Sequence, residues 1–366
     1  MAQYPLNMDP ALDPSRLAQA LDLLQSVVDT SEVPAAATAI ALQDRLLAHE
    51  ALGRPGWADE EPPLSPDTSF LVASITKPVV CMGAMLLVEQ GIIALEDPVA
   101  RYVPAFASQG KQGITLRHLM THTSGLPDQL VQNVTLREQH ADLERFVEAV
   151  CALEPLFPPG TRVSYQSMGL LMLGQVIELV TGQPLRVWLR ENLFEPLGMA
   201  RTTLGMPEAG LTASVRANDS PVETQSNVES DWGWNSAYWR DLGAPWGGLH
   251  ATADDLSRLL QHMLGARPGP LSPAARRAMV RDQTAALPHI PPEQRLTDRW
   301  GLGWRLGASS CGDLVSRNTF GHTGATGTLF WADPETGLSC VLLTNRPESH
   351  RLFARYSNAV AAAVRG

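Results

Sequence analysis

The chain has 366 residues, of which 44% are hydrophobic and 18% are charged, a composition typical of a soluble globular protein with two domains or one core and a second lobe. Its formal net charge of -10, without any Lys- and Arg-rich run, excludes a surface built to bind nucleic acid. No segment is apolar over the length of a membrane span, and residues 1–10 lack the basic start and apolar stretch of a signal peptide, so we expect a cytoplasmic protein.

The first segments predict a helix followed by a hairpin. Apolar residues recur with helical spacing over residues 17–28. Two apolar runs, residues 36–42 and 45–52, flank a polar pair and are typical of two strands joined by a tight turn. Gly, Pro, Asp and Glu are frequent over residues 53–68, which we expect to form a loop.

Residues 75–90 predict the next helix, and its start carries the first candidate for chemistry. Because proline is tolerated only in a first turn, Pro78 places the helix start near Ser74, and Gly91 is the expected left-handed cap. Ser74 and Lys77 form an S-x-x-K motif, whose spacing puts a hydroxyl and an amine on one helical face. Lys77 can then accept the Ser74 proton, while the positive helix N-terminus favours an alkoxide and lowers the pKa of the amine.

Lysine is rare in this chain, since only Lys77 and Lys111 occur among its 28 basic residues. A desolvated lysine can act as a base, whereas arginine stays protonated, so each lysine is a candidate base. Ser108 and Lys111 also match S-x-x-K, but they lie among glycines with no apolar periodicity around them. We therefore expect this second pair to form a solvated loop without catalytic function.

The middle and the end of the chain predict a helical region followed by strands. Helical stretches cover residues 143–153, 168–180 and 253–264, and alternating apolar residues over 328–332 and 338–344 predict two strands. A last helix is expected over residues 351–364.

Strands at both ends with helices between them predict an α/β (α+β) fold with one sheet built from both termini. We expect residues 1–75 and 245–366 to form the sheet domain and residues 76–244 a mainly helical lobe. The active site is expected between the two.

Scattered cysteines and a histidine pair are candidates for metal binding or disulfides. His118 and His122 have the i, i+4 spacing of a helical zinc pair, but position 119 is Leu where the zinc motif has Glu, which favours a structural role. Four cysteines without C-x-x-C spacing predict reduced, mostly buried thiols. These cysteines are Cys81, Cys151, Cys311 and Cys340.

Aromatic residues concentrate in one irregular segment, residues 231–246. Such a segment either walls an acyl pocket or packs an irregular loop, and the sequence leaves both open. The residues are Trp232, Trp234, Tyr238, Trp239 and Trp246.

Several segments together resemble the serine β-lactamases, the D-alanyl-D-alanine carboxypeptidases and the β-lactamase-like esterases, most nearly the class C branch. The segments are residues 70–77, 116–127, 158–174, 196–199, 247–256 and 321–327. The resemblance covers about residues 15–360. It implies a β-lactamase/transpeptidase-like fold, with an antiparallel sheet flanked by helices and a helical lobe. It also implies acylation of Ser74, with Lys77 as the proton acceptor and no metal or organic cofactor.

The Tyr-x-Asn triplet of that family is matched by Tyr165, Gln166 and Ser167. The resemblance implies that the Tyr165 phenol relays a proton to the leaving group and helps to activate the deacylating water. Ser167 is implied as a substrate-binding residue, but it replaces an Asn whose amide can both donate to and accept from a substrate amide. A shorter hydroxyl cannot do both, which favours esters over β-lactams and peptides.

The family's Lys-Thr-Gly or His-Thr-Gly strand is matched by His322, Thr323 and Gly324. This histidine form resembles D-peptidases and esterases, and it implies that the imidazole polarises the network of Tyr165 and Ser74. Thr323 and Gly324 are implied to flank the substrate.

Two further groups follow from the same matching. The backbone N–H groups of Ser74 and Ala325 are implied to form the oxyanion hole. Asn345 and Arg346 end the last predicted strand in a position that implies contact with a substrate carboxylate, with an exposed strand end as the alternative.

These features predict a serine hydrolase that forms an acyl-enzyme on Ser74 and acts on a small ester or amide, with small esters preferred. A D-amino-acid peptidase or a weak β-lactamase is the alternative enzyme. A non-catalytic binding or sensor module of the same fold is a further alternative, against which the Ser74, Lys77 and Tyr165 set argues. No G-x-S-x-G elbow of an α/β-hydrolase occurs, and the oligomeric state stays open.

Overall fold

A computed structural model describes residues 12–58, 60–218, 230–285, 287, 289–307, 311–347 and 349–365. Residues 1–10, on which the signal-peptide expectation rests, lie outside the described residues. Among the described residues no single helix is long and apolar enough to cross a membrane, and one sharply bent pair, Met168–Thr181 with Leu185–Leu197, meets these criteria of length and composition only jointly.

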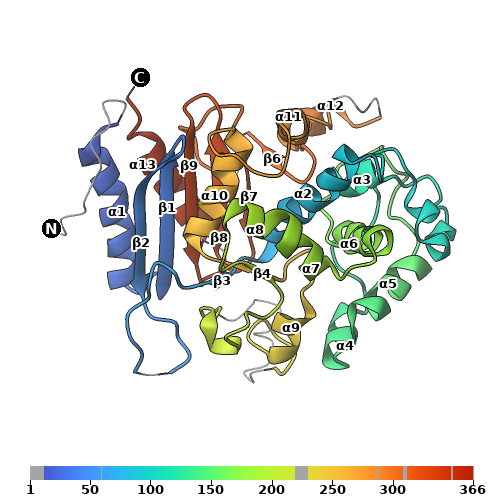
Figure 1. Cartoon of the computed structure of the whole chain (residues 1–366), viewed down its shortest axis with the longest axis horizontal. Coiled ribbons are helices and arrows are strands. Elements are labelled where there is room, and N and C mark those ends of the chain that lie inside the picture. The colour runs from blue at the N-terminus through green and yellow to red at the C-terminus, as the bar shows by residue number, and fades with distance from the viewer. Residues whose placement is uncertain are drawn as a thin grey trace.

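A six-stranded antiparallel sheet joins the two ends of the chain, in the order β2-β1-β9-β8-β7-β6. The strand β1 pairs with β2 on one side and with β9 on the other, so that Ala36 lies opposite Thr344. The predicted fold class, with one antiparallel sheet built from both termini, is confirmed (Figure 1). The strands are β1 (Ala35–Leu42), β2 (Arg45–Gly53), β6 (Arg305–Leu306), β7 (Phe320–Gly324), β8 (Thr328–Asp333) and β9 (Leu338–Thr344).

Helices cover both faces of this sheet, which explains why every residue of β1 is buried. On one face, α1 (Pro14–Asp29) packs beside α13 (His350–Ala361), and their apolar side chains form a core with residues such as Trp331. On the other face lies α10 (Ala253–Leu264), whose bounds match the predicted helix (Figure 1). The closing helix α13 ends three residues before the predicted limit of 364.

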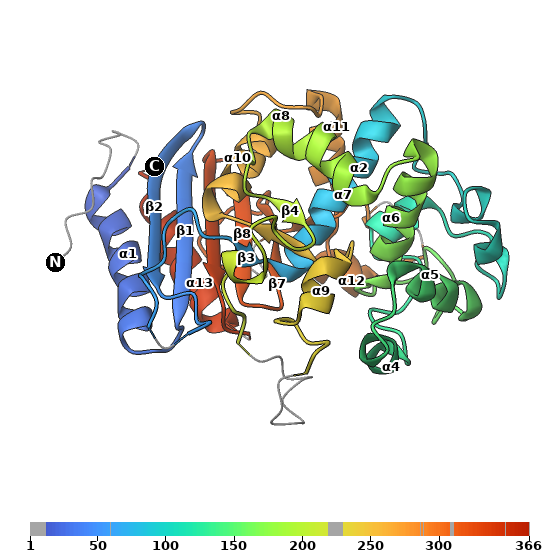
Figure 2. The same ribbon diagram turned by 60° about the horizontal axis from the view of Figure 1, so that its bottom comes forward.

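The helical lobe is built around two buried helices, α2 (Thr76–Glu89) and α6 (Met168–Thr181), which pack against each other (Figure 2). Gly91 follows α2 with φ 71°, as expected of a left-handed cap. The other helices are α3 (Leu116–Met120), α4 (Asn133–Glu138), α5 (Leu143–Ala152), α7 (Leu185–Leu189), α8 (Glu195–Leu197) and α9 (Ala237–Leu242).

A small three-stranded sheet connects the lobe to the main sheet. Its order is β3-β5-β4, formed by β3 (Phe70–Leu71), β5 (Leu249–Ala251) and β4 (Thr203–Leu204). One apolar core passes from the main sheet into the lobe, because the same cluster contains Val341 of β9 and Leu171 of α6. The division at residues 76 and 245 stays a prediction.

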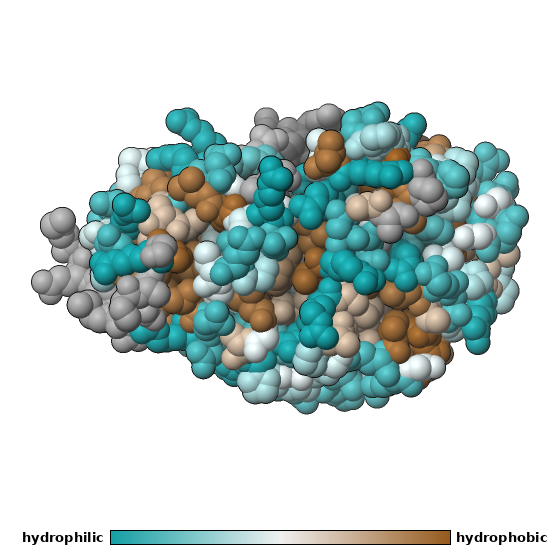
Figure 3. All heavy atoms as spheres, turned by 90° about the horizontal axis from the view of Figure 1, so that it is seen from above, coloured by the Kyte–Doolittle hydropathy of each residue, from teal (hydrophilic) through white to brown (hydrophobic). Residues whose placement is uncertain are grey.

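Two short helices come from the C-terminal third, α11 (Pro273–Val280) and α12 (Pro292–Thr297), and the N–H of Ser272 before α11 donates to Glu89 at the end of α2 at 3.0 Å. Gln294 of α12 accepts a hydrogen bond from the Val163 N–H at 3.2 Å, which ties this segment to the lobe. On the face seen in Figure 3, hydrophobic side chains lie in small groups among hydrophilic ones.

The expectation of a solvated loop at the second S-x-x-K pair is wrong for Lys111, which is fully buried. Its ammonium donates to the carbonyl oxygens of Cys151 at 3.0 Å and Leu153 at 2.5 Å, and the Ser108 hydroxyl also donates to Cys151 at 2.7 Å. The last carbonyl groups of a helix have no intrahelical partner, so both side chains satisfy the end of α5. The pair has a structural role. All four cysteines are buried, as expected.

Candidate active site

Ser74 lies in a single helical turn, Ala73–Ile75, that joins β3 to α2. Ala73 has φ 46°, a left-handed conformation that costs a residue with a side chain about 1 to 3 kcal/mol. Hydrogen bonds hold this turn, because the Thr76 hydroxyl donates to the Ala73 carbonyl at 2.6 Å and accepts from the Leu249 N–H at 3.0 Å. The turn presents a partly exposed Ser74 at the start of a buried helix.

Lys77, one turn along, is buried directly beside Ser74. Its Nζ lies 2.8 Å from Ser74 Oγ and donates to the Trp246 carbonyl at 2.9 Å. Burial lowers the pKa of Lys77 to about 7, and the nearby Asp128 carboxylate opposes this shift. A large fraction of the amine is therefore neutral at pH 7 and can accept a proton.

Tyr165 lies next to both Lys77 and Ser74. The Lys77 Nζ is 4.7 Å from the centroid of the Tyr165 ring, so the phenol lies close to the Ser74 and Lys77 pair. Burial raises the pKa of Tyr165, and a hydrogen bond with Ser74 partly opposes this shift. The phenol is therefore protonated at neutral pH and can donate.

His322 completes the group from β7, with its ring centroid 5.8 Å from that of Tyr165. Burial, and next the Lys77 charge, lower the pKa of His322 to about 3, so the imidazole is neutral. Its Nδ1 lies 2.7 Å from the Thr323 carbonyl, which can only accept, so Nδ1 carries the proton. The Nε2 atom then holds a lone pair, and it has no hydrogen-bond partner in the described part of the chain.

Ser74, Tyr165 and His322 line one cavity of about 450 Å³, as the sequence-based geometry requires, while Lys77 lies beneath Ser74. Aromatic side chains of Trp234, Trp300 and Phe353 form much of the wall. The other lining residues are Gln129, Arg137, Arg305, Thr323, Gly324, Ala325, Pro347, Ser349 and His350.

The end of β7 places main-chain groups next to Ser74. A side chain at Gly324 would lie 2.2 Å from the Val72 carbonyl oxygen, so only glycine allows β7 to lie this close to the nucleophile turn. Ala325 follows, exposed and lining the cavity, and its N–H has no acceptor among the residues that the structure describes. This placement suits the expected oxyanion hole of the Ser74 and Ala325 N–H groups.

Three residues expected to bind substrate are not brought to the cavity. The Ser167 hydroxyl donates to Asp128 at 2.5 Å. Asn345 accepts from the Ala35 N–H at 3.2 Å and donates to the Arg216 carbonyl at 3.0 Å. Arg346 donates to the Glu32 carbonyl at 2.6 Å. The side chains of Asn345 and Arg346 thus bind backbone groups of β1 and of neighbouring loops, and their role in substrate binding stays a prediction.

Arg305, which the sequence did not single out, also lines the cavity. It lies on β6 opposite Gly321 of β7, and it is half-buried. Its guanidinium makes no hydrogen bond or ion pair with any residue that the structure describes. A half-buried cation without a protein partner favours a substrate with a negatively charged group.

The aromatic segment contributes both to the cavity wall and to the packed core. Trp234 lines the cavity, whereas Trp239 and Trp246 are buried in the core. The Arg137 guanidinium lies 4.1 Å from the Trp239 ring centroid and donates to the Trp232 carbonyl at 3.0 Å. Arg137 thus fixes the loop that carries the cavity wall.

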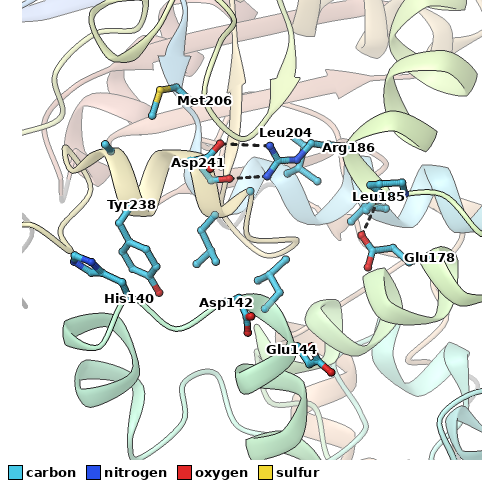
Figure 4. A pocket seen from close by; sticks show the side chains of 15 residues that line it. His140, Asp142, Glu144, Glu178, Leu185, Arg186, Leu204, Met206, Tyr238 and Asp241 are labelled. Atoms are coloured by element: carbon cyan, nitrogen blue, oxygen red, sulfur yellow. Dashed lines mark hydrogen bonds and ion pairs between the residues drawn. The ribbon is translucent and has the colours of Figure 1, made fainter.

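A wider hollow of about 800 Å³ lies between α5, α7 and α9 (Figure 4). Its polar groups are partly engaged with one another, since Arg186 pairs with Asp241 at 3.4 Å and Glu178 accepts from the Leu185 N–H at 2.7 Å. No serine, threonine, cysteine or lysine occurs among the described residues that line it. The chemistry of acyl transfer is therefore assigned to the smaller cavity.

The match to known proteins agrees with this geometry. The Beta-lactamase family model matches residues 21–365. The chain belongs to the Beta-lactamase family. Membership in this family, together with the esterase relative, shows that the protein is a serine hydrolase.

Named relatives of this Beta-lactamase family member include an esterase and a peptidase. Esterase EstB of Burkholderia gladioli is 30% identical over 383 aligned residues, covering 93% of this chain and 94% of the relative. A putative D-alanyl-D-alanine carboxypeptidase of Escherichia coli strain K12 is 27% identical, covering 77% of this chain and 70% of the relative.

Solved structures share the fold over nearly the whole chain. EstCE1, a hydrolase with promiscuous acyltransferase activity, has a TM-score of 0.79 at 22% identity and covers 96% of this chain and 99% of its own. A family VIII carboxylesterase has a TM-score of 0.79 at 18% identity, with 98% and 100% covered.

The Asp128 charge makes a testable contribution to this site. Because its carboxylate opposes the lowering of the Lys77 pKa, Asp128→Asn should move that pKa below about 7. The acidic limb of the pH profile of kcat/KM should then move to lower pH, since the neutral amine is the active form. The exposed Glu144, which lines the wider hollow, gives a charge-matched control: Glu144→Gln should leave the limb in place. A limb that moves upward in Asp128→Asn contradicts this assignment.

Proposed function

We propose that this protein is a carboxylesterase that forms an acyl-enzyme on Ser74 and hydrolyses it with water. The observation that carries the proposal is the 2.8 Å contact between Ser74 Oγ and a buried Lys77 whose pKa is lowered to about 7. A serine with a neutral amine at hydrogen-bond distance, inside a cavity, is the arrangement that nucleophilic acyl transfer needs.

Acylation begins when Ser74 Oγ bonds to the ester carbonyl carbon and the neutral Lys77 amine takes the hydroxyl proton. The N–H groups of Ser74 and Ala325 would stabilise the oxyanion. The bond to the alcohol oxygen then breaks as the Tyr165 phenol gives its proton to that oxygen and regains one from the Lys77 ammonium. The lone pair on His322 Nε2, which has no partner among the described residues, would accept a hydrogen bond from water or substrate beside this relay.

Deacylation follows the same groups in reverse. Water attacks the acyl carbon while one of its protons passes to the Tyr165 and Lys77 pair. The bond from Ser74 Oγ to the acyl carbon breaks, Oγ takes a proton back, and the carboxylic acid leaves. No step requires a group from outside the chain apart from water and the ester.

The residue at position 167 favours ester substrates over amide substrates. The Ser167 hydroxyl donates to Asp128, and Gln129 is the one carboxamide among the described residues that line the cavity. A substrate amide left partly unpaired loses about 1 to 3 kcal/mol per group, which is about one to two decades in rate. Esters lack the amide N–H and avoid this loss.

A D-amino-acid peptidase is the second candidate, and Arg305 is the observation that favours it. A peptide ends in a carboxylate, which a half-buried guanidinium without a protein partner would bind. A neutral ester leaves Arg305 without such a partner.

A substrate panel separates the candidates. We expect the protein to hydrolyse short-chain p-nitrophenyl esters far better than a chromogenic cephalosporin or D-alanyl peptides, measured as kcat/KM for each. Ser167→Asn should narrow the gap by raising amide turnover, since Asn is longer than Ser and can donate to Asp128 while extending its carbonyl oxygen toward the cavity, which the Ser167 hydroxyl does not line. Efficient peptide or cephalosporin turnover with poor ester hydrolysis would establish the second candidate or a β-lactamase instead.

A further inference from the structure

We propose that His122 is a positioning residue that holds Tyr165 in place for proton transfer. This inference rests on the proposed role of Tyr165 in catalysis. His122 does not line the cavity, so it acts through Tyr165 rather than on the substrate.

The backbone around Tyr165 is fixed from both sides by this one residue. The His122 carbonyl accepts a hydrogen bond from the Ser164 N–H at 2.8 Å, and its Nδ1 accepts one from the Gln166 N–H at 3.1 Å. Both chain neighbours of Tyr165 are therefore bound to His122. A shift of His122 would move the tyrosine backbone directly.

The imidazole also contacts the tyrosine ring itself. The ring centroids of His122 and Tyr165 are 4.8 Å apart, and the His122 ring meets Trp300 edge-to-face at 4.2 Å. Trp300 belongs to the wall of the cavity. His122 thus connects the proposed proton donor to the surface that the substrate touches.

The backbone conformation and the hydrogen bonding of His122 also argue against a role that is only space-filling. It is fully buried with φ 58°, a left-handed conformation costing about 1 to 3 kcal/mol for a residue with a side chain. Because Nδ1 accepts from a backbone N–H, the neutral ring carries its proton on Nε2, which has no hydrogen-bond partner among the described residues. A phenylalanine would fill the same space without a buried unpaired N–H. What it would lack is the acceptor for Gln166.

A double-mutant cycle tests the proposal, with His122→Phe made in the wild type and in Tyr165→Phe. His122→Phe keeps a ring but removes the Nδ1 acceptor, and a small displacement of a catalytic group costs about 100-fold in rate. We expect kcat to fall about 100-fold with KM changed less than about threefold. In Tyr165→Phe, where the hydroxyl is gone, the same change should alter kcat less than about twofold.

A second variant and a matched histidine complete the experiment. Asn offers an acceptor near the Nδ1 position and tolerates left-handed backbone, so His122→Asn should recover at least about tenfold of the loss in His122→Phe. His118 caps α3 by accepting the Thr115 N–H at 3.1 Å, and Gln suits that capping position. His118→Gln should therefore keep kcat within about twofold.

The outcomes separate the inference from the proposed function. Equal losses of kcat in the two backgrounds would overturn the positioning role, because a general loss of structure does not depend on the Tyr165 hydroxyl. If Tyr165→Phe alone left kcat unchanged, the proposed catalytic role of Tyr165 would fail instead. If His122→Phe does not fold by circular dichroism, the cycle is run with His122→Leu, which also lacks the acceptor for the Gln166 N–H. A loss of kcat confined to the protein that keeps the Tyr165 hydroxyl supports the proposal, and equal losses in the two backgrounds overturn it.

Discussion

Ser74→Ala should lower ester turnover by about four to six orders of magnitude, the range measured when the nucleophile of a serine hydrolase is removed. The reason is specific to the site: no other hydroxyl among the described residues lies at 2.8 Å from a lysine with a lowered pKa. The measurement is kcat/KM with a p-nitrophenyl ester. A second readout is the covalent adduct on the intact protein by mass spectrometry, which should be absent in the variant.

The chain supplies its own control in Ser108. Ser108→Ala keeps Ser74 and removes only a hydrogen bond to the Cys151 carbonyl at the end of α5. Turnover should stay near the wild-type value, with at most about 1 kcal/mol lost from the free energy of unfolding. Similar losses of turnover in Ser74→Ala and Ser108→Ala would refute the assignment of the nucleophile.

Lys77→Arg should lower kcat/KM at pH 7 by at least about 1000-fold, although it keeps a positive charge at the site. A guanidinium is not deprotonated in proteins and cannot accept the Ser74 proton. The wild-type profile should rise with pH through a pKa of about 7, because the lowered pKa makes the amine the active form only above that value. The variant should show no such limb. A variant that retained the wild-type rate would mean that Lys77 supplies charge rather than a base.

The fold could be predicted where local patterns are strong. The amphipathic run that became α10 and the Pro78 and Gly91 signals around α2 gave helix positions close to those observed, because capping and periodicity act over one or two turns. The sheet of both termini followed from the order of the elements. The strand β6 could not be predicted in this way, because it has two residues and these are too few to show an alternating pattern.

Among the site residues, too, local contacts could be predicted and contacts with distant parts of the chain could not. Ser74 and Lys77 lie three residues apart in one helical turn, so their contact is local. The surroundings of Lys111 and Arg305 depend on partners far along the chain: Lys111 satisfies carbonyls about 40 residues away, and Arg305 reaches the cavity only because β6 pairs with β7. The direction of Asn345 and Arg346 at the end of β9 is likewise set by loops that the local sequence does not specify.

The pairing of β1 with β9 has a consequence for the order in which this protein is made and folded. The Thr38 hydroxyl of β1 donates to the Val341 carbonyl of β9, 303 residues later in the chain. During synthesis the hairpin of β1 and β2 is therefore complete long before β9 leaves the ribosome. Until then, the edge of β1 that pairs with β9 has no partner strand. Contacts of this sequence separation slow folding, because a long loop must close before they form. Since His322, Gly324 and Ala325 belong to the same late region of the chain, the complete site can assemble around Ser74 only after these residues have been translated.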